Sequence, residues 1–284
     1  MTLDRAVAEH VFESLSEAIG PNRTACSLFE TAQGRWTLTV HFADLAELAA
    51  IRALVEDAAG ADTANALIFD TVAETDWVTA SLTGLAPVPA GRFVVHGAHD
   101  RARVPPNHIG IEIEAALAFG TGHHGTTRGC LLALDRMVKA RRPRRILDIG
   151  TGTGVLAIAA AKAFRRPVLA SDIDMRAITM ARTNARLNHT GPLVETVLAF
   201  GLEHKRFQQR APFDLVLANI LLGPLQRLAR PIVGVLAPRG QVVLSGLLQA
   251  HANAALAAYR LQGLILERHI LLDGWVTLVL RRGL

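Results

Sequence analysis

The chain has 284 residues, of which half are hydrophobic, a net charge of +5 at neutral pH and only two cysteines. Two cysteines are too few for a disulfide framework, and no apolar stretch reaches the roughly 18 residues of a membrane-spanning helix, so a disulfide-rich secreted protein and a helical membrane protein are excluded. We expect a cytoplasmic protein with no membrane partner, long enough for two domains. The densest basic run, KARRPRRI at 139–146, is favoured as a solvated connector over a dedicated binding patch.

The first part of the chain, residues 1–75, contains short segments with alternating helical and strand patterns. Apolar residues recur at helical spacing in some segments and at a spacing of two in others. This order predicts a small α+β domain with helices on one face of a sheet. The expected elements are a helix over 4–19, strands over 25–31 and 35–42, a helix beginning at Asp44 and a strand over 66–72.

Residues 76–106 have a looser pattern. Four prolines interrupt any long element, and GRFVVHG at 91–97 is the only strand-like piece. We expect this stretch to be an inter-domain linker that pairs partly with its neighbours.

From residue 107 to residue 284, apolar strands alternate with helices. This rhythm predicts an α/β fold, a Rossmann-like parallel sheet of seven strands with helices on both faces. The turn at Asp273–Gly274 predicts a hairpin, so the last strand is expected to run antiparallel. The expected strands lie at 144–150, 167–173, 194–201, 213–221, 240–248, 264–273 and 275–284, and the expected helices at 155–164, 176–188, 224–236 and 250–262.

A glycine-rich stretch, LDIGTGTGVLA at 147–157, joins the first strand of this sheet to its first helix. Gly150, Gly152 and Gly154 allow a tight turn and let a ligand lie against bare backbone, and the helix N-terminus offers unpaired N–H groups. Asp172 ends the next strand, where a carboxylate accepts both ribose hydroxyls of an adenosine. The pattern predicts a nucleoside site. Because the stretch 152–157 also fits G-x-G-x-x-A, a nicotinamide or flavin cofactor is an alternative.

Three features favour S-adenosylmethionine over a dinucleotide. Asp148, just before the glycines, offers an acid for the ligand's ammonium group, which a pyrophosphate cofactor lacks. The antiparallel C-terminal hairpin is typical of methyltransferase sheets. The stretch AFGTGHHGTT at 118–127 precedes the first core strand and is expected to close over the methionine end of the ligand.

Four segments carry a resemblance to a known family: LAFGTGHHGTT at 117–127, ILDIGTGTGVLAIAAAK at 146–162, SDIDMRAITMARTNARLN at 171–188 and FDLVLANILLGPLQRLAR at 213–230. The chain resembles the bacterial methyltransferases that modify ribosomal large-subunit protein eleven, the PrmA family. The resemblance implies a class I S-adenosylmethionine-dependent methyltransferase core behind an N-terminal substrate-recognition domain. It also implies S-adenosylmethionine as the cofactor and that ribosomal protein as the partner, free or on the ribosome, with no nucleic acid required.

By motif position, the resemblance implies cofactor contacts at Thr127, Gly150, Asp172 and Asn219. Thr127, aided by Thr126, is expected to bind the methionine carboxylate. Asn219, at the end of the fourth strand, is the candidate catalytic residue, because its amide both donates and accepts and so orients an incoming amine. Relatives that modify glutamine have Asn-Pro-Pro-Tyr where this chain has NILL, so lysine ε-amines and the N-terminal α-amine are the implied acceptors.

Other functions stay open at this point. They are a related methyltransferase with another protein substrate, methylation of a small molecule, and a catalytically silent nucleoside-binding module that docks on ribosomes. A metal site among the histidines at 96, 99, 108, 123 and 124 is disfavoured, since no carboxylate or cysteine follows at ligand spacing and methyl transfer from a sulfonium requires no metal. For Glu112 and Glu114, a structural role and a ligand-side role are equally favoured.

Overall fold

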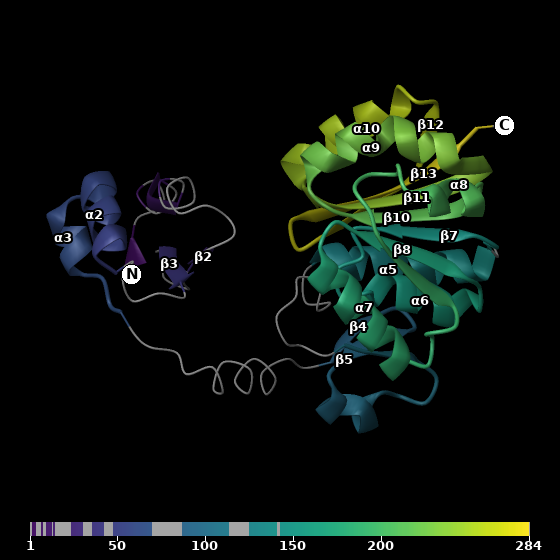
Figure 1. Ribbon diagram of the computed structural model, residues 1–284, viewed down its shortest axis with the longest axis horizontal. Helices are drawn as coiled ribbons and strands as arrows, with labels where there is room; N and C mark the ends of the chain where they lie inside the picture. Colours follow the sequence, from purple (N-terminus) through teal and green to yellow (C-terminus); the bar gives the residue numbers. More distant parts are fainter. Residues whose placement is uncertain are drawn as a thin grey trace. The chain divides into compact units, whose positions relative to one another are not determined.

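The computed structural model divides into two compact units, Met1–Ala73 and Glu74–Leu284 (Figure 1). The structure describes residues 2–3, 7, 10–12, 14, 24–30, 36–42, 48–69, 87–113, 125–140 and 143–283. None of the helices within these ranges is long and apolar enough to cross a membrane.

The first unit contains a small antiparallel sheet and helices. The strands pair in the order β1-β3-β2, and helix α2 buries Ile51 and Val55 against Val11 and Ala64. Of the expected helix over 4–19, residues 7, 10–12 and 14 are helical, and the rest lie outside the described residues. The elements are β1 (Thr2–Leu3), β2 (Thr24–Glu30), β3 (Trp36–Phe42), α2 (Leu48–Ala59) and α3 (Ala61–Asn65).

The strand expected over 66–72 is wrong for its described part, since residues 67–69 are not in a strand. A short helix, α3, precedes them, and β1 supplies the third strand of the sheet. Leu67 and Phe69 pack against the helical core while Ile68 is 88% exposed. The alternation that suggested a strand therefore reflects alternate burial against helices, without strand pairing.

Two strands of a three-stranded sheet lie in the stretch expected to be a linker, of which the structure describes residues 87–106. Strand β4 (Val88–Ala90) pairs antiparallel with β5 (Phe93–His96), which pairs parallel with β6 (Ile109–Glu112). A 3-10 helix, η2 (Ala98–Arg103), lies between β5 and β6. Val88, Phe93 and Val95 are buried in the same core as the main sheet, so the stretch from residue 88 contributes to the second unit rather than only connecting to it.

The main sheet has seven strands in the order β12-β13-β11-β10-β7-β8-β9, and β13 runs antiparallel to both of its neighbours. The expected Rossmann-like sheet with an antiparallel last strand is thus confirmed. The strands are β7 (Ile146–Ile149), β8 (Val168–Asp172), β9 (Val194–Leu198), β10 (Phe213–Asn219), β11 (Leu236–Leu248), β12 (Leu264–Leu272) and β13 (Trp275–Arg282). The helices are α5 (Gly125–Ala140), α6 (Val155–Phe164), α7 (Met175–Leu187), α8 (Lys205–Arg210), α9 (Leu222–Val235) and α10 (Ala252–Arg260), with the 3-10 helix η3 (Gln249–His251).

Helices cover both faces of this sheet, with α5 and α6 on one side and α9 and α10 on the other (Figure 1). Side chains of β10 alternate between the two cores: Leu215 and Leu217 face the first, Val216 and Ala218 the second. A strand buried on both faces is apolar throughout, which explains the uninterrupted apolar runs in the sequence.

The strand order reverses between β7 and β10, because the chain passes from β7 to β8 and β9 on one side and then returns to β10 on the other. Ligands of open parallel sheets bind at such a point, outside the carboxyl ends of the strands. The glycine-rich stretch follows β7, and Asn219 ends β10, so both lie at this point.

Candidate functional site

The glycine-rich loop packs tightly against the end of β10. Gly150, Gly152 and Gly154 all have left-handed backbone conformations, with φ of 67°, 53° and 83°. A Cβ added to Gly150 would lie 2.2 Å from Cγ2 of Ile220, the residue after Asn219. Only glycine meets both demands at position 150, so the loop and the end of β10 form one continuous surface.

Asp148, near the end of β7, holds this loop through a hydrogen bond. Its side chain is 1% exposed, and its Oδ2 accepts a hydrogen bond of 2.6 Å from the Thr151 hydroxyl. Burial raises the pKa of Asp148 to about 7, while hydrogen bonds from Thr151 and the Ala157 backbone lower it. The sequence suggested that this acid holds a ligand ammonium group; in the structure the carboxylate faces the loop and the start of α6.

Asp172 ends β8 beside the loop. One oxygen accepts a hydrogen bond of 2.9 Å from the backbone N–H of Gly152, and the other accepts one of 3.1 Å from the N–H of Asp174. Each oxygen retains a further lone pair, and the side chain is half-buried. The carboxylate is therefore held in place and still able to accept two hydroxyl groups.

Asn219 meets the start of α5. Its Nδ2 lies 3.5 Å from the Thr126 hydroxyl and 3.4 Å from the Thr127 hydroxyl. Thr126 and Thr127 are in the first turn of α5, where backbone N–H groups have no partner within the helix. Two hydroxyls, an amide and a helix N-terminus therefore converge at the carboxyl end of β10, which suits an anionic group.

A buried polar group under the threonines was not anticipated from the sequence. The Ser245 hydroxyl, which is fully buried, donates to the Thr126 carbonyl at 3.2 Å and lies 2.9 Å from the Thr277 hydroxyl. Ser245 is the neighbour of Asn219 across the β10–β11 pair. A serine between the apolar residues Val242–Leu244 and Leu247 of β11 was the available signal, because a hydroxyl that is buried with such neighbours requires a partner.

Two glycines let α5 approach the C-terminal strands. A Cβ on Gly125 would lie 2.5 Å from the Leu272 carbonyl oxygen, and one on Gly129 would lie 2.2 Å from the Thr277 hydroxyl. The C-terminal hairpin thus sets the position of the helix start that carries the two threonines.

Large apolar side chains are exposed around the carboxyl ends of the strands. Ile173, directly after Asp172, is 68% exposed, Phe200 after β9 is 81% exposed and Leu221 after β10 is 74% exposed. Exposed side chains of this size that follow successive strands form an apolar rim, which suits a flat ring system or an aliphatic chain. The sequence signal for this rim was an apolar residue directly beyond the end of each of these strands, where a loop is usually polar.

The structure brings together two groups of the residues expected from the sequence. Gly150, Gly152 and Asp172 form one, and Thr126, Thr127 and Asn219 the other. Residues 118–124 of the expected lid lie outside the described residues.

Glu112 forms an ion pair and Cys130 is buried, whereas His123 and His124 lie outside the described residues. Arg101 donates two hydrogen bonds of 2.8 Å to Glu112 and lowers the pKa of that carboxyl, while Glu114 lies outside the described residues. Burial raises the pKa of the Cys130 thiol to about 12. Among the residues that the structure describes, no three His, Cys, Asp or Glu side chains are grouped to hold a metal.

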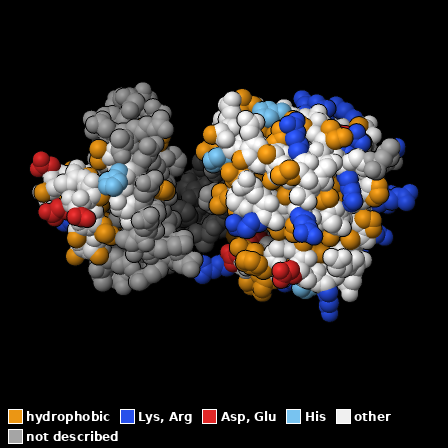
Figure 2. Space-filling view, turned by 90° about the horizontal axis from the view of Figure 1, so that it is seen from above, with side chains coloured by type: hydrophobic (Ala, Val, Ile, Leu, Met, Phe, Trp, Pro, Cys, Tyr) orange, Lys and Arg blue, Asp and Glu red, His pale blue; other side chains and the backbone are white. Residues whose placement is uncertain are grey.

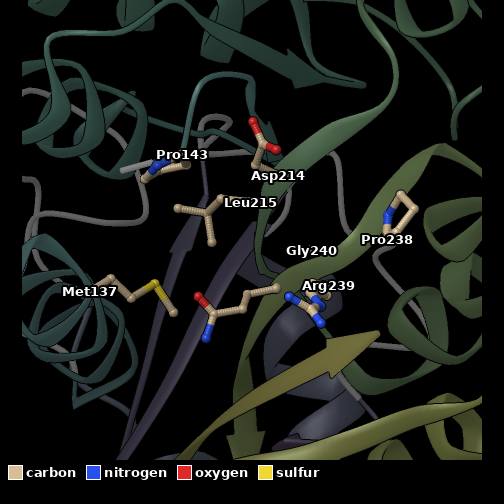
Figure 3. Close-up of a pocket in the computed structure, with 8 residues that line it drawn as sticks. Met137, Pro143, Asp214, Leu215, Pro238, Arg239 and Gly240 are labelled. Carbon is tan, nitrogen blue, oxygen red and sulfur yellow. The ribbon is translucent and has the colours of Figure 1, made fainter. Parts of the chain in front are cut away.

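A pocket of about 210 Å³ lies at the amino ends of the strands, opposite the site described above (Figure 3). Its lining comes from the end of α5 and the starts of β10 and β11, including Met137, Asp214 and Arg239. These are the amino ends of the strands, so the pocket is separate from the residues described above.

The chain is similar to proteins of one family over nearly its whole length. The family described as ribosomal protein L11 methyltransferase (PrmA) matches residues 13–283. Two proteins named ribosomal protein L11 methyltransferase are similar over nearly the whole chain. One, from Rhodopseudomonas palustris (strain BisB5), is 54% identical over 98% of this chain and 95% of its own length. The other, from Bradyrhizobium diazoefficiens, is 55% identical over 98% of this chain and 94% of its own length.

A solved structure also resembles this chain. It is a ribosomal protein L11 methylase from Lactobacillus delbrueckii subsp. bulgaricus, with 27% sequence identity and a TM-score of 0.63. The match covers 70% of this chain and all of that chain.

The protonation of Asp148 gives a testable pH dependence. In the folded chain the carboxyl keeps its proton up to about pH 7, whereas in the unfolded chain it loses it near its ordinary pKa of 3.8. Between these values the folded state binds the extra proton, so this group lowers the free energy of unfolding as pH rises, by at most about 1.4 kcal/mol per pH unit.

We expect Asp148→Asn to remove this contribution, so that the variant gains stability relative to the parent between pH 4 and pH 7. Urea unfolding at a series of pH values measures it. Asp174→Asn, a change at an exposed carboxylate, is the control. Parallel pH profiles for the parent and Asp148→Asn would show that the buried carboxyl is already ionised at low pH.

Proposed function

Because the chain belongs to the ribosomal protein L11 methyltransferase family, we propose that it transfers methyl groups from S-adenosylmethionine to amino groups of ribosomal protein L11. The acceptors in this proposal are lysine ε-amines and the N-terminal α-amine. The convergence of Asn219 with Thr126 and Thr127 beside the glycine-rich loop is the observation that carries the proposal. A cytoplasmic location is part of this proposal and is supported by the ribosomal substrate.

The residues at the carboxyl edge fit this cofactor. The Asp172 carboxylate would accept the ribose hydroxyls, and exposed Ile173 and Phe200 would contact the adenine ring. Thr126 and Thr127, at the N-terminus of α5, would bind the methionine carboxylate. In this arrangement Asp148 would act through the loop that it supports, since its carboxylate accepts the Thr151 hydroxyl.

When bound, S-adenosylmethionine supplies a methyl group attached to a sulfonium leaving group. The chain's own task is to present a neutral amine in line with that group. The Asn219 side-chain oxygen would accept an N–H of the amine and so fix the direction of its lone pair. A lysine has an ordinary pKa near 10.4, and an apolar rim that includes Leu221 would lower it by desolvation.

We assign substrate recognition to the first unit, within residues 1–75, and methyl transfer to the second. Residues 88–112 would belong to the catalytic domain, because β4, β5 and β6 share its core. Presentation by a separate unit explains why a small-molecule methyltransferase is disfavoured, since a small substrate requires no second folded unit. Another protein substrate and a silent ribosome-docking module remain the competing functions.

The first experiment incubates the protein with labelled S-adenosylmethionine and purified ribosomal protein L11, followed by intact-mass analysis. We expect methyl groups on amines of L11. Asn219→Ala should lower kcat by about 100-fold, the scale of a lost orienting contact, and should also weaken cofactor binding, because Asn219 is an expected cofactor contact. A silent module would add no methyl group, and a related enzyme would label a different protein in a ribosomal extract.

The second experiment measures cofactor affinity by calorimetry. Asp172→Ala should weaken binding by about 1.5–3 kcal/mol, or roughly 10- to 150-fold, because charge-assisted hydrogen bonds to the ribose are lost. Asp172→Asn keeps an oxygen for the Gly152 N–H and should lose less. Asp174→Ala, two residues away and exposed, is the matched control. Unchanged affinity in Asp172→Ala would remove this residue from the ribose site.

The third experiment deletes residues 1–73. The second unit has its own core, so the shortened chain should bind S-adenosylmethionine with nearly the affinity of the full chain. Methylation of L11 should fall to background. A shortened chain that modifies L11 at the full rate would contradict recognition by the first unit.

A further inference from the structure

The two units carry opposite net charges. Residues 1–73 contain 4 basic and 11 acidic residues, whereas residues 74–284 contain 26 basic and 14 acidic residues. A general preference for arginine in the coding sequence would act on both units alike. Composition bias therefore does not explain the basic excess of the second unit.

The view in Figure 2 agrees with this division. Lys and Arg side chains are spread over the visible face of the second unit, while Asp and Glu side chains are few there. In the first unit, the exposed carboxylates include Glu56, Asp57 and Asp62.

Many cations of the second unit lie at the amino ends of the strands, opposite the candidate methyl-transfer site. The chain returns to this edge after each helix, and the returning segments are basic. We call the following eight exposed residues the basic edge: Lys139, Arg144, Arg145, Arg165, Arg166, Arg210, Arg239 and Arg260. The pocket of Figure 3, which Arg239 lines, opens within it.

Carboxylates at this edge have partners already. Glu195 forms ion pairs with Arg206 and Arg210, and Glu267 forms one with Arg281. Asp214 accepts hydrogen bonds of 2.8 and 2.9 Å from the backbone N–H groups of residues 144 and 145, not from their guanidinium groups. Among the described residues of the basic edge, five cations form neither an ion pair nor a side-chain hydrogen bond, and their charge is left for an external anion: Lys139, Arg144, Arg165, Arg166 and Arg260.

Helix dipoles account for only part of this pattern. Cations in the last turn of a helix are favourable, and Lys139, Arg210 and Arg260 are such residues. Arg165 and Arg239, however, have φ of 52° and 60°, a left-handed conformation that glycine or asparagine adopts at lower cost. Neither of these two arginines lies within the last turn of a helix, so the helix dipole does not account for them.

We propose that the basic edge binds the phosphate backbone of double-stranded RNA. Guanidinium groups match phosphate oxygens in charge and geometry. Of the aromatic residues in the helices and strands that end here, Phe207, Phe213 and Tyr259 are buried. The half-buried Phe164 packs against the core, so these rings offer little stacking surface for unpaired bases. Backbone contact to a duplex, without sequence preference, is the mode that these side chains fit.

This inference rests on the proposed function, because a ribosomal substrate brings the protein close to RNA. The basic edge and the carboxyl ends of the strands lie at opposite ends of one sheet, so bound RNA leaves the methyl-transfer site open. RNA then serves to hold the enzyme near its substrate and is not required for the transfer.

The test uses the full chain and a fluorescent RNA duplex of about 20 base pairs, with anisotropy measured between about 50 and 200 mM salt. The edge variant combines Arg144→Ser, Arg165→Asn and Arg166→Ser. We expect its Kd to rise at least about 10-fold and the slope of log Kd against log salt to fall by about three, one for each lost phosphate contact. The control combines Arg182→Ser, Arg227→Ser and Arg230→Ser, which remove the same charge from the surfaces of α7 and α9, and its Kd should change less than about threefold.

Any of three results would overturn the inference. The first is no RNA binding by the parent below about 100 µM, which is the weak end of nonspecific nucleic-acid affinity. The second is an equal loss of affinity in the edge and control variants, and the third is tighter binding to phosphatidylserine vesicles than to RNA. Methylation of L11 by the edge variant at the parent's rate, together with weakened RNA binding, supports it. RNA binding at the edge by a protein that methylates no L11 would overturn the proposed function and leave this inference standing.

Discussion

The contact between the loop after β7 and the residue after β10 is the constraint on which the rest of the site depends. The two strands are hydrogen-bonded neighbours, and Gly150 lies so close to Ile220 that any side chain on it would collide. This approach places Gly152 where its N–H meets Asp172 and leaves Asn219 facing the start of α5. Residues from three distant parts of the sequence thereby form one surface.

Support for that surface comes from buried polar groups rather than from the exposed ones. Asp148 holds the loop through Thr151, and Ser245 holds the carbonyl of Thr126 from the neighbouring strand. Buried groups of this kind are costly unless paired, so each fixes the position of its partner. The site is in this sense preorganised by the core of the sheet.

Much of this arrangement followed from the sequence. The strands of the main sheet were predictable because they are buried on both faces, and the glycine-rich loop because a strand precedes it and a helix follows. The sheet of β4, β5 and β6 was not, because the prolines in and beside β4 and before β6 gave the signal of a linker. In addition, β5 pairs with β6 across an intervening 3-10 helix, which no local pattern announces. The direction of the Asp148 side chain was equally hidden, since motif spacing places a residue on a strand but does not say which partner it meets.

The C-terminal hairpin has a genetic consequence. Leu272 and Thr277 touch Gly125 and Gly129 at the base of the helix that carries the two threonines, although nearly 150 positions separate them in the chain. A nonsense mutation in the final codons would leave the glycine-rich loop, Asp172 and Asn219 intact in the translated product. It would nevertheless remove the strand residues against which the start of α5 packs. The position of the two threonines therefore depends on the C-terminal hairpin as well as on the motifs.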